Sequence, residues 1–259
     1  MRESSLTAAD ITDNLGTRFI GQRVIYYPRL KSTMDMARRE AQQGAREGTV
    51  VIAEEQTAGR GRIKRAWLSP KGSIALSIIL YPDLRYLSSL IMVASLGVVH
   101  AVEKVTGLKS QIKWPNDVLT NGKKVCGILI ESGVKGKRLD YATVGIGINV
   151  NLRLSDFPEI PPTATSLSQE LGRDVSQLDM LRCLLAEIEE LYLALPAGDS
   201  VYQQWRDSLV TLGKRVQVSS DEITYEGIAE SVASDGSLLL RQSDGSLTKI
   251  VAGDVTLRD

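Results

Sequence analysis

The order of the expected helices and strands constrains the fold of this chain more than any other feature. In residues 22–150, stretches that alternate between apolar and polar side chains, or are continuously apolar, are interrupted by two helical patterns. Strict strand–helix alternation would favour a doubly wound parallel sheet, whereas this mixture favours an α+β fold with a mixed or antiparallel sheet. The expected strands are residues 22–27, 50–53, 72–81, 112–114, 118–119, 125–132 and 140–150.

Helices are expected to back this sheet, at residues 33–43, 84–105, 178–195 and 200–209. The first begins at Ser32-Thr33-Met34-Asp35, the Ser-x-x-Asp variant of a capping box, and ends at Gly44. Asn121-Gly122 predicts a hairpin turn, and so do residues 135–137. Residues 157–165 are rich in proline and threonine, so we expect a loop that crosses the surface.

The pattern changes at Gly213. Beyond it, short strands are separated by turn segments, which are Ser219-Ser220-Asp221, Ser234-Asp235-Gly236 and Ser243-Asp244-Gly245. This spacing is typical of a small all-β barrel of about 45 residues. We therefore expect an N-terminal arm at 1–20, a large domain at 21–211 and a small barrel at 212–259.

Composition narrows the class of protein. Lys+Arg and Asp+Glu both number 31, and the resulting net charge of zero argues against bulk nucleic-acid binding. Cys126 and Cys183 are far apart and lack the spacing of a disulfide framework or a zinc site. No opening segment resembles a signal peptide, and the apolar run at 91–99 is too short to span a bilayer. We expect a cytoplasmic protein that does not associate with membranes.

A segment rich in glycine and arginine follows the strand at 50–53. Four cationic side chains lie within the six residues from Arg60 to Arg65, and Gly59 and Gly61 are interleaved with them. Glycine lets the backbone approach a ligand closely, and arginine offers planar donors suited to phosphate or carboxylate. Such a loop can close over an anion. A solvated basic turn, or a patch that contacts nucleic acid, would have the same composition.

A second polar group lies at Lys113-Trp114-Pro115-Asn116-Asp117. Proline interrupts the strand there, so one bend presents an ammonium group, an amide and a carboxylate. Asn116 and Asp117 carry the hard oxygen ligands that suit Mg²⁺. The alternative is an Asx-type turn, in which both side chains bond only their own backbone.

Two later strands carry glycines at positions that could face a ligand. Lys124 precedes a strand with Gly127 near its start, and Gly145-Ile146-Gly147 places two glycines on one face of the last strand. Alternate glycines leave room beside a sheet for a flat, mostly apolar ligand, although a close helix crossing would explain them equally well. Lys124 could place its charge beside a phosphate or carboxylate, or be an ordinary surface lysine beside a hairpin.

Several familiar sites are missing from the sequence. It contains no Gly-x4-Gly-Lys-Ser/Thr phosphate loop and no Gly-x-Gly-x-x-Gly after the first strand. His100, the only histidine, lies within an apolar helical pattern, and no serine-nucleophile motif is present. An enzyme built from this chain would therefore act by binding and electrostatics around an activated phosphate.

Taken together, these motifs closely resemble the biotin–protein ligases in order and spacing over residues 22–258. The matching segments are Ser32-Thr33, Gln56 with Gly59-Arg60-Gly61-Arg62 and Trp67, Lys113 to Asp117, Lys124 with Gly127-Ile128-Leu129-Ile130-Glu131, and Gly145-x-Gly147-x-Asn149. The resemblance implies an SH3-like C-terminal domain after a domain that binds biotin and ATP. It also implies synthesis of biotinyl-5′-AMP with Mg²⁺, followed by transfer of biotin to one lysine of a biotin carboxyl carrier domain.

The resemblance also implies roles for individual residues. Biotin would contact Ser32, Thr33, Gln56, Gly59, Arg60, Gly61, Arg62, Lys124, Gly127, Gly145 and Gly147. ATP would contact Arg62, Arg65, Trp67, Asn116, Asn149, Asp254 and Arg258. The catalytic residues would be Lys124, Arg60, Arg62 and Lys113, and Asp117 would be a ligand of Mg²⁺.

Three positions depart from the family pattern. Met34 follows Ser32-Thr33 where some relatives carry a polar residue, Cys126 replaces a small residue, and Asp254 is shorter than the usual Glu. No winged-helix domain precedes residue 20, so the chain resembles the monofunctional class that does not repress transcription. Relatives often pair through the outer sheet, and the strands at 125–150 could supply an edge or face for a homodimer.

Two alternatives share part of this evidence. A lipoate–protein ligase or octanoyltransferase has the same catalytic fold, with an elongated apolar acid in place of biotin. A nucleic-acid-binding module could combine a basic loop with a small barrel, although the net charge of zero counts against it.

Overall fold

The computed structural model describes residues 6–63, 65–136, 138–220 and 223–258, and it contains two sheets. The larger sheet has seven strands in the order β1-β2-β3-β7-β6-β5-β4. These are Val24–Leu30, Val50–Gln56, Ser73–Leu80, Arg138–Asn149, Lys123–Lys135, Asp117–Thr120 and Ser110–Lys113. β1 and β2 are parallel and the other neighbours are antiparallel, which confirms the predicted mixed sheet.

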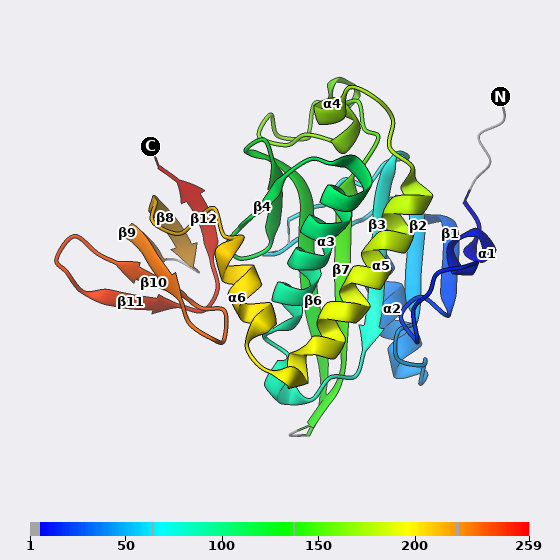
Figure 1. Cartoon of the computed structure of the whole chain (residues 1–259), viewed down its shortest axis with the longest axis horizontal. Helices are drawn as coiled ribbons and strands as arrows, with labels where there is room; N and C mark the ends of the chain where they lie inside the picture. The colour runs from blue at the N-terminus through cyan, green and yellow to red at the C-terminus, as the bar shows by residue number, and fades with distance from the viewer. Residues whose placement is uncertain (1–5, 64, 137, 221–222, 259) are drawn as a thin grey trace.

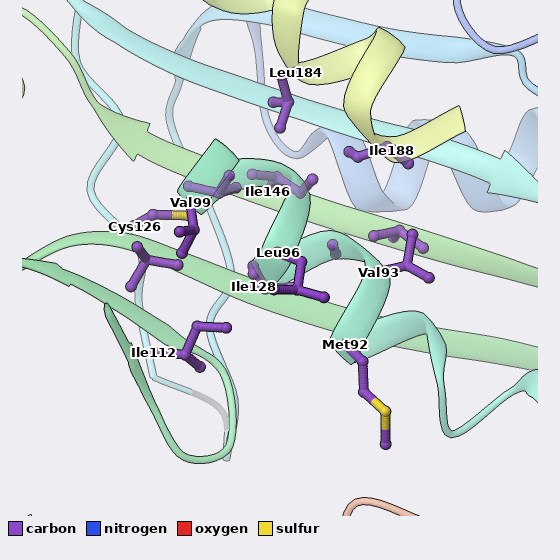
Figure 2. Packing of buried hydrophobic residues seen from close by; sticks show 14 of the residues in the cluster. Met92, Val93, Leu96, Val99, Ile112, Cys126, Ile128, Ile146, Leu184 and Ile188 are labelled. Atoms are coloured by element: carbon purple, nitrogen blue, oxygen red, sulfur yellow. The ribbon is translucent and has the colours of Figure 1, made fainter. Parts of the chain in front are cut away.

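Two long helices cover one face of this sheet (Figure 1): α3 (Leu90–Thr106) and α5 (Gln177–Ala194). Apolar side chains of α3, the sheet and α5 form one buried cluster, and Figure 2 shows members from α3 (Val93, Leu96 and Val99), from the sheet (Ile128 and Ile146) and from α5 (Leu184 and Ile188). A Cβ atom on Gly97 would lie 2.7 Å from Cγ1 of Ile188, so glycine allows the two helices to cross closely.

The helix α2 (Thr33–Gln42) packs on the opposite face of the sheet, where Ala37 and Ala41 contact Val51 and Ile79. Its predicted start is confirmed, because the Ser32 hydroxyl accepts a hydrogen bond from the amide of Asp35 at 3.4 Å. α2 contacts β2, β3 and β7. α2 does not cover β5 or the start of β6, at residues 117–127. That part of the face is therefore free of the helix.

The remaining short elements are α1 (Ala8–Thr12), α4 (Leu167–Leu171), α6 (Ser200–Asp207) and the 3₁₀ turns Leu84–Tyr86, Leu154–Asp156 and Leu195–Ala197. The prediction of a single helix at 84–105 is wrong at its N-terminal end. Asp83 caps a separate 3₁₀ turn through the amide of Arg85, and α3 begins only at Leu90. None of the described helices is long and apolar enough to cross a membrane.

Both hairpin turns between β5, β6 and β7 fall where they were predicted. Asn121 and Gly122 have φ values of 51° and 76°, the left-handed pair that a tight two-residue turn requires. In the second turn, Gly136 has φ of 64°, and Lys137 lies outside the described residues.

The C-terminal sheet has the strand order β11-β10-β9-β8-β12 and is antiparallel throughout. In chain order its strands β8 to β12 are Arg215–Ser220, Ile223–Val232, Leu238–Arg241, Leu247–Ile250 and Asp254–Leu257. The indole nitrogen of Trp114 donates to the Gly236 carbonyl at 2.8 Å, and the Trp114 amide donates to Thr211 Oγ1 at 2.9 Å. The Lys-Trp-Pro-Asn-Asp bend is therefore also the place where the two sheets are joined.

Candidate active site

A cavity of about 280 Å³ lies on the face of the large sheet that carries α2. Val144, Ile146 and Ile148 point into the core beneath α3, so the alternating Gly145 and Gly147 face the other side. The cavity is lined by the loop at residues 57–67, called the glycine–arginine loop below, by β5, β6 and β7, by the loop at 159–164 and by the C-terminal domain.

Large side chains lie directly on the glycines of the sheet. A Cβ atom on Gly147 would lie 2.3 Å from Trp67 Nε1, and one on Gly127 would lie 2.9 Å from Trp67 Cζ3. A Cβ atom on Gly145 would lie 2.6 Å from Met34 Sδ. Trp67 Nε1 is buried and has no hydrogen-bond partner among the described residues. The indole ring of Trp67 and the thioether of Met34 therefore pack directly on this face of the sheet, where the absence of a side chain on each glycine makes room for them.

One end of the cavity carries neutral polar groups. The Gln56 side-chain oxygen accepts hydrogen bonds from the amide of Thr33 at 2.8 Å and from its hydroxyl at 3.1 Å. Ser77 donates to the Thr33 hydroxyl at 2.9 Å, which fixes that side chain from the sheet. Ser32 is buried beside them as the N-cap of α2. This end presents amide and hydroxyl groups without a charge.

The opposite end is charged. Lys124 Nζ lies 2.7 Å from Asp117 Oδ1 and 5.4 Å from the centre of the Trp67 ring, and Lys113 Nζ lies 3.8 Å from Asp117 Oδ2. Asn116 exchanges two hydrogen bonds with the backbone of Ile128, so its bend is fastened to β6. Its side-chain oxygen accepts from Arg62 at 2.9 Å. The Asx-type turn therefore does not account for Asn116.

The arginines of the loop reach in two directions. Arg60 pairs with Glu131 of β6 and with Asp35 of α2, whereas Arg62 donates to the Gly253 carbonyl at 3.2 Å and Arg65 lies 2.5 Å from Asp254. Burial lowers the pKa of the Arg62 guanidinium, with Asp254 and Asp117 opposing the shift. An arginine kept near carboxylates in a partly dry site is suited to binding an incoming anion.

Two matches identify the family. Residues 26–149 match the biotin/lipoate A/B protein ligase family, and residues 211–258 match the biotin protein ligase C-terminal domain. The chain is 36% identical to the bifunctional ligase/repressor BirA of Bacillus subtilis, over 99% of this chain and 80% of that protein. The chain belongs to the biotin protein ligase family.

Another relative and a solved structure agree with this assignment to the biotin protein ligases. The biotin–[acetyl-CoA-carboxylase] ligase of Mycobacterium tuberculosis is 32% identical over 85% of this chain and 83% of its own length. The biotin protein ligase of Aquifex aeolicus, solved with biotin and ATP, is 31% identical with a TM-score of 0.75, covering 92% of this chain and 99% of that one. The family resemblance, the α+β fold with its SH3-like end and the biotin–protein ligase activity are confirmed.

Most of the residues expected from the biotin protein ligase pattern meet in this cavity. Those that line it are Thr33, Gln56, Arg60, Gly61, Arg62, Arg65, Trp67, Asn116, Asp117, Lys124, Gly127, Gly145, Gly147, Asn149 and Asp254. Asn149 is buried and donates to the Thr165 carbonyl at 3.0 Å. Ser32, Gly59, Lys113 and Arg258 do not line it. Arg258 is exposed on the small sheet and donates to Gln217 at 2.5 Å.

Sequence reasoning missed one wall of the cavity. Residues 157–165 do form a loop, but it does more than cross the surface, since Glu159, Ile160, Pro161, Thr163 and Ala164 line the cavity. The loop is held beside β6 because the Lys124 amide donates to Thr163 at 2.9 Å and the Thr165 amide donates to Lys124 at 2.8 Å. No local pattern signals this pairing, because its partners lie about forty residues apart along the chain.

Proposed function

We propose that this cavity binds biotin and ATP, forms biotinyl-5′-AMP, and then transfers biotin to a lysine of a biotin carboxyl carrier domain. The observation that carries the proposal is one cavity lined by three glycines and an indole ring, with neutral polar groups at one end and Lys124 with Arg62 at the other. A fused-ring acid with an uncharged polar head and a carboxylate tail matches that order of groups. The naming of relatives as biotin–[acetyl-CoA-carboxylase] ligases supports the carrier domain as acceptor.

In this arrangement, the ring end of biotin takes hydrogen bonds from Thr33 and Gln56, and Ser32 is within the same buried group. The ring system lies against Trp67 on the face of the sheet that carries Gly127, Gly145 and Gly147, and the backbone of Gly59 to Arg62 covers it. The carboxylate tail then points toward Lys124.

The first step is attack of a biotin carboxylate oxygen on the α-phosphorus of ATP, which breaks the bond to pyrophosphate. Negative charge builds on the phosphoryl oxygens, and the cationic groups of Lys124 and Arg62 stabilise it. In the second step the neutral amine of the carrier lysine attacks the biotin carbonyl, and AMP leaves as the amine proton is lost. Neither step needs a nucleophile from this chain.

Nucleotide contacts are proposed for Arg62, Arg65, Trp67, Asn116, Asn149 and Asp254, which all line the cavity. Arg258 belongs to the same proposal, but its guanidinium must leave Gln217 to reach the nucleotide. Lys113 acts through Asp117, since its ammonium approaches that carboxylate rather than the cavity.

Magnesium is proposed to accompany ATP. Within the described residues no cluster of three or more His, Cys, Asp or Glu side chains could hold a metal by itself. Mg²⁺ is commonly held by one or two carboxylates plus substrate phosphates, and Asp117 is one carboxylate in the cavity, so the donor set fits. When bound, the ion would neutralise phosphate charge during the first step.

The decisive experiment compares biotin with lipoate, because the matching family model includes ligases for both acids. Biotin should raise the melting temperature, and biotin with ATP and Mg²⁺ should raise it further and release pyrophosphate. Lipoate should do neither at the same concentration. Stabilisation by lipoate, with pyrophosphate release, would replace biotin as the proposed substrate.

We further propose a cytoplasmic enzyme that does not bind nucleic acid. The net charge of zero supports this, and the repressor activity in the name of the Bacillus subtilis protein is a property of that protein. Duplex DNA at low salt should show no binding, and a salt-dependent complex would contradict the proposal.

A homodimer remains part of the proposal. Beyond Ile128, the described residues of β6 pair with β7 on one side and have no strand on the other, so they form an open edge. The exposed Val134 lies on the same part of the strand. Sedimentation at tens of micromolar with biotin, ATP and Mg²⁺ should show a dimer. A monomer under those conditions would rule it out.

A further inference from the structure

Arg60 forms the ion pairs that join the glycine–arginine loop to α2 and β6. We propose that Glu131 and Asp35 are positioning residues that clamp this loop through Arg60 and thereby retain the adenylate until the acceptor lysine arrives. The retention of the adenylate rests on the proposed function. The clamp itself is a property of three side chains and can be tested separately.

The geometry of the clamp is specific. Arg60 Nη1 lies 2.8 Å from Glu131 Oε1, and Nη2 donates to Glu131 Oε2 at 3.0 Å, which is a bidentate pair. The same Nη2 lies 3.1 Å from Asp35 Oδ1. The hydrogen bond to Glu131 is the main cause that raises the pKa of Arg60. The guanidinium is therefore already occupied by two carboxylates.

The two carboxylates come from two different elements, α2 and β6, that both contribute residues to the cavity lining. Asp35 is in the first turn of α2, two residues after Thr33, and Glu131 is on β6, four residues after Gly127. Arg60 is itself inside a small antiparallel loop, since the Trp67 amide donates to Gly59 at 2.9 Å. Fastening Arg60 therefore keeps Trp67 over Gly127 and Gly147.

Charge is balanced within this network. Arg38 pairs with Asp35 at 3.2 Å, so two guanidinium groups face two carboxylates. Arg60 has two carboxylate partners, one of them bidentate, so it has less charge available for the phosphate than Lys124, which has one close carboxylate partner. Its side chain is 36% exposed, and those of Glu131 and Asp35 are 31% and 43% exposed. Salt should therefore weaken the clamp.

The experiment compares Glu131→Gln and Asp35→Asn with a matched control, Glu40→Gln. Glu40 is also on α2 and also pairs with an arginine, Arg23 at 3.3 Å, but it does not line the cavity. Each protein is loaded with biotin, labelled ATP and Mg²⁺, desalted rapidly, and followed for release of the adenylate. We expect release about fivefold faster for Glu131→Gln and about twofold faster for Asp35→Asn. The control should match the original chain.

Two further measurements make the proposal specific. Raising the salt concentration should speed release more from the original chain than from Glu131→Gln, because that variant keeps only the screened pair between Arg60 and Asp35. The double variant Arg60→Met with Glu131→Gln should release the adenylate no faster than Arg60→Met alone, because Arg60→Met already removes the pair with Glu131. Additive effects, or release at the control rate in both single variants, would overturn the clamp.

Failure of the clamp and failure of the proposed function give different results. If the original chain releases no pyrophosphate with biotin, the proposed function fails, and the clamp is then judged by hydrogen exchange of the ligand-free chain. The amides of Gly61 and Trp67, which bond to Arg65 and Gly59, should exchange faster in Glu131→Gln than in Glu40→Gln. Equal exchange would reject the clamp without reference to activity.

Discussion

At the scale of single residues, Lys124 is the cation best placed for adenylate formation. Its ammonium lies between Asp117 and the Trp67 ring at the charged end of the cavity. Lys124→Ala removes a positive charge from a partly buried site where negative charge develops, so pyrophosphate release should fall by on the order of 10²–10³. The neighbouring Lys123 is exposed, and Lys123→Ala should leave the rate close to normal. Similar rates for both variants would refute this role.

Asp235 supplies a pH-dependent contact in the small sheet. Its hydrogen bond with Lys249, and a second with the Ser237 amide, lower its pKa from 3.8 to about 2. A depressed pKa stabilises the folded state above 3.8, and this stability is lost as the pH falls toward 2. Because the pair is partly exposed, Asp235→Asn should cost less than about 1 kcal/mol of unfolding free energy at pH 7.

Acid unfolding measures that contribution. The stability difference between the original chain and Asp235→Asn should shrink from pH 4 to pH 2, where the native carboxyl is itself protonated. A difference that stays constant over this range would assign the effect to packing rather than charge.

At the scale of elements, the glycine–arginine loop is where order should depend on ligand. Gly59 and Gly61 give it a weak intrinsic preference for one conformation, and the ion pairs of Arg60 and Arg65 that hold it are partly exposed, so contacts with a bound ligand should add to its order. With biotin and ATP, the amides of Gly61 and Trp67 should exchange at least tenfold more slowly than without, while those of β3 should not change. Lys64 lies outside the described residues. Equal exchange in both states would contradict this prediction.

At the scale of the whole molecule, the C-terminal domain completes the cavity. Asp254 lines it and pairs with Arg65 at 2.5 Å, and the Gly253 carbonyl accepts from Arg62. Asp254→Ala should therefore raise the KM for ATP about fivefold and change the affinity for biotin much less. Asp244→Ala, in an exposed turn of the same sheet, is the control. An unchanged KM would show that Asp254 has no part in nucleotide binding.

Much of the fold could be predicted from the sequence because its signals are local. The Ser32 cap and the Asn121-Gly122 turn each depend on a few neighbouring residues, and the apolar stripe of α5 depends on the spacing of residues within one helix. The break at residues 87–89 was missed because apolar periodicity continues across it, whereas Asp83 caps the start of a separate 3₁₀ turn that ends at Tyr86.

The sequence by itself determined the α+β class, the change to a small sheet after Gly213, and the motifs whose residues line the cavity. These depend on the period of apolar residues and on turn residues, which act over short stretches of chain. Only the tertiary structure decided that Arg60 would meet Glu131, that Asp254 would meet Arg65, and that the loop at 157–165 would line the cavity. Such contacts join segments far apart in the chain, so they depend on strand order, register and the packing of both domains, which no local pattern encodes.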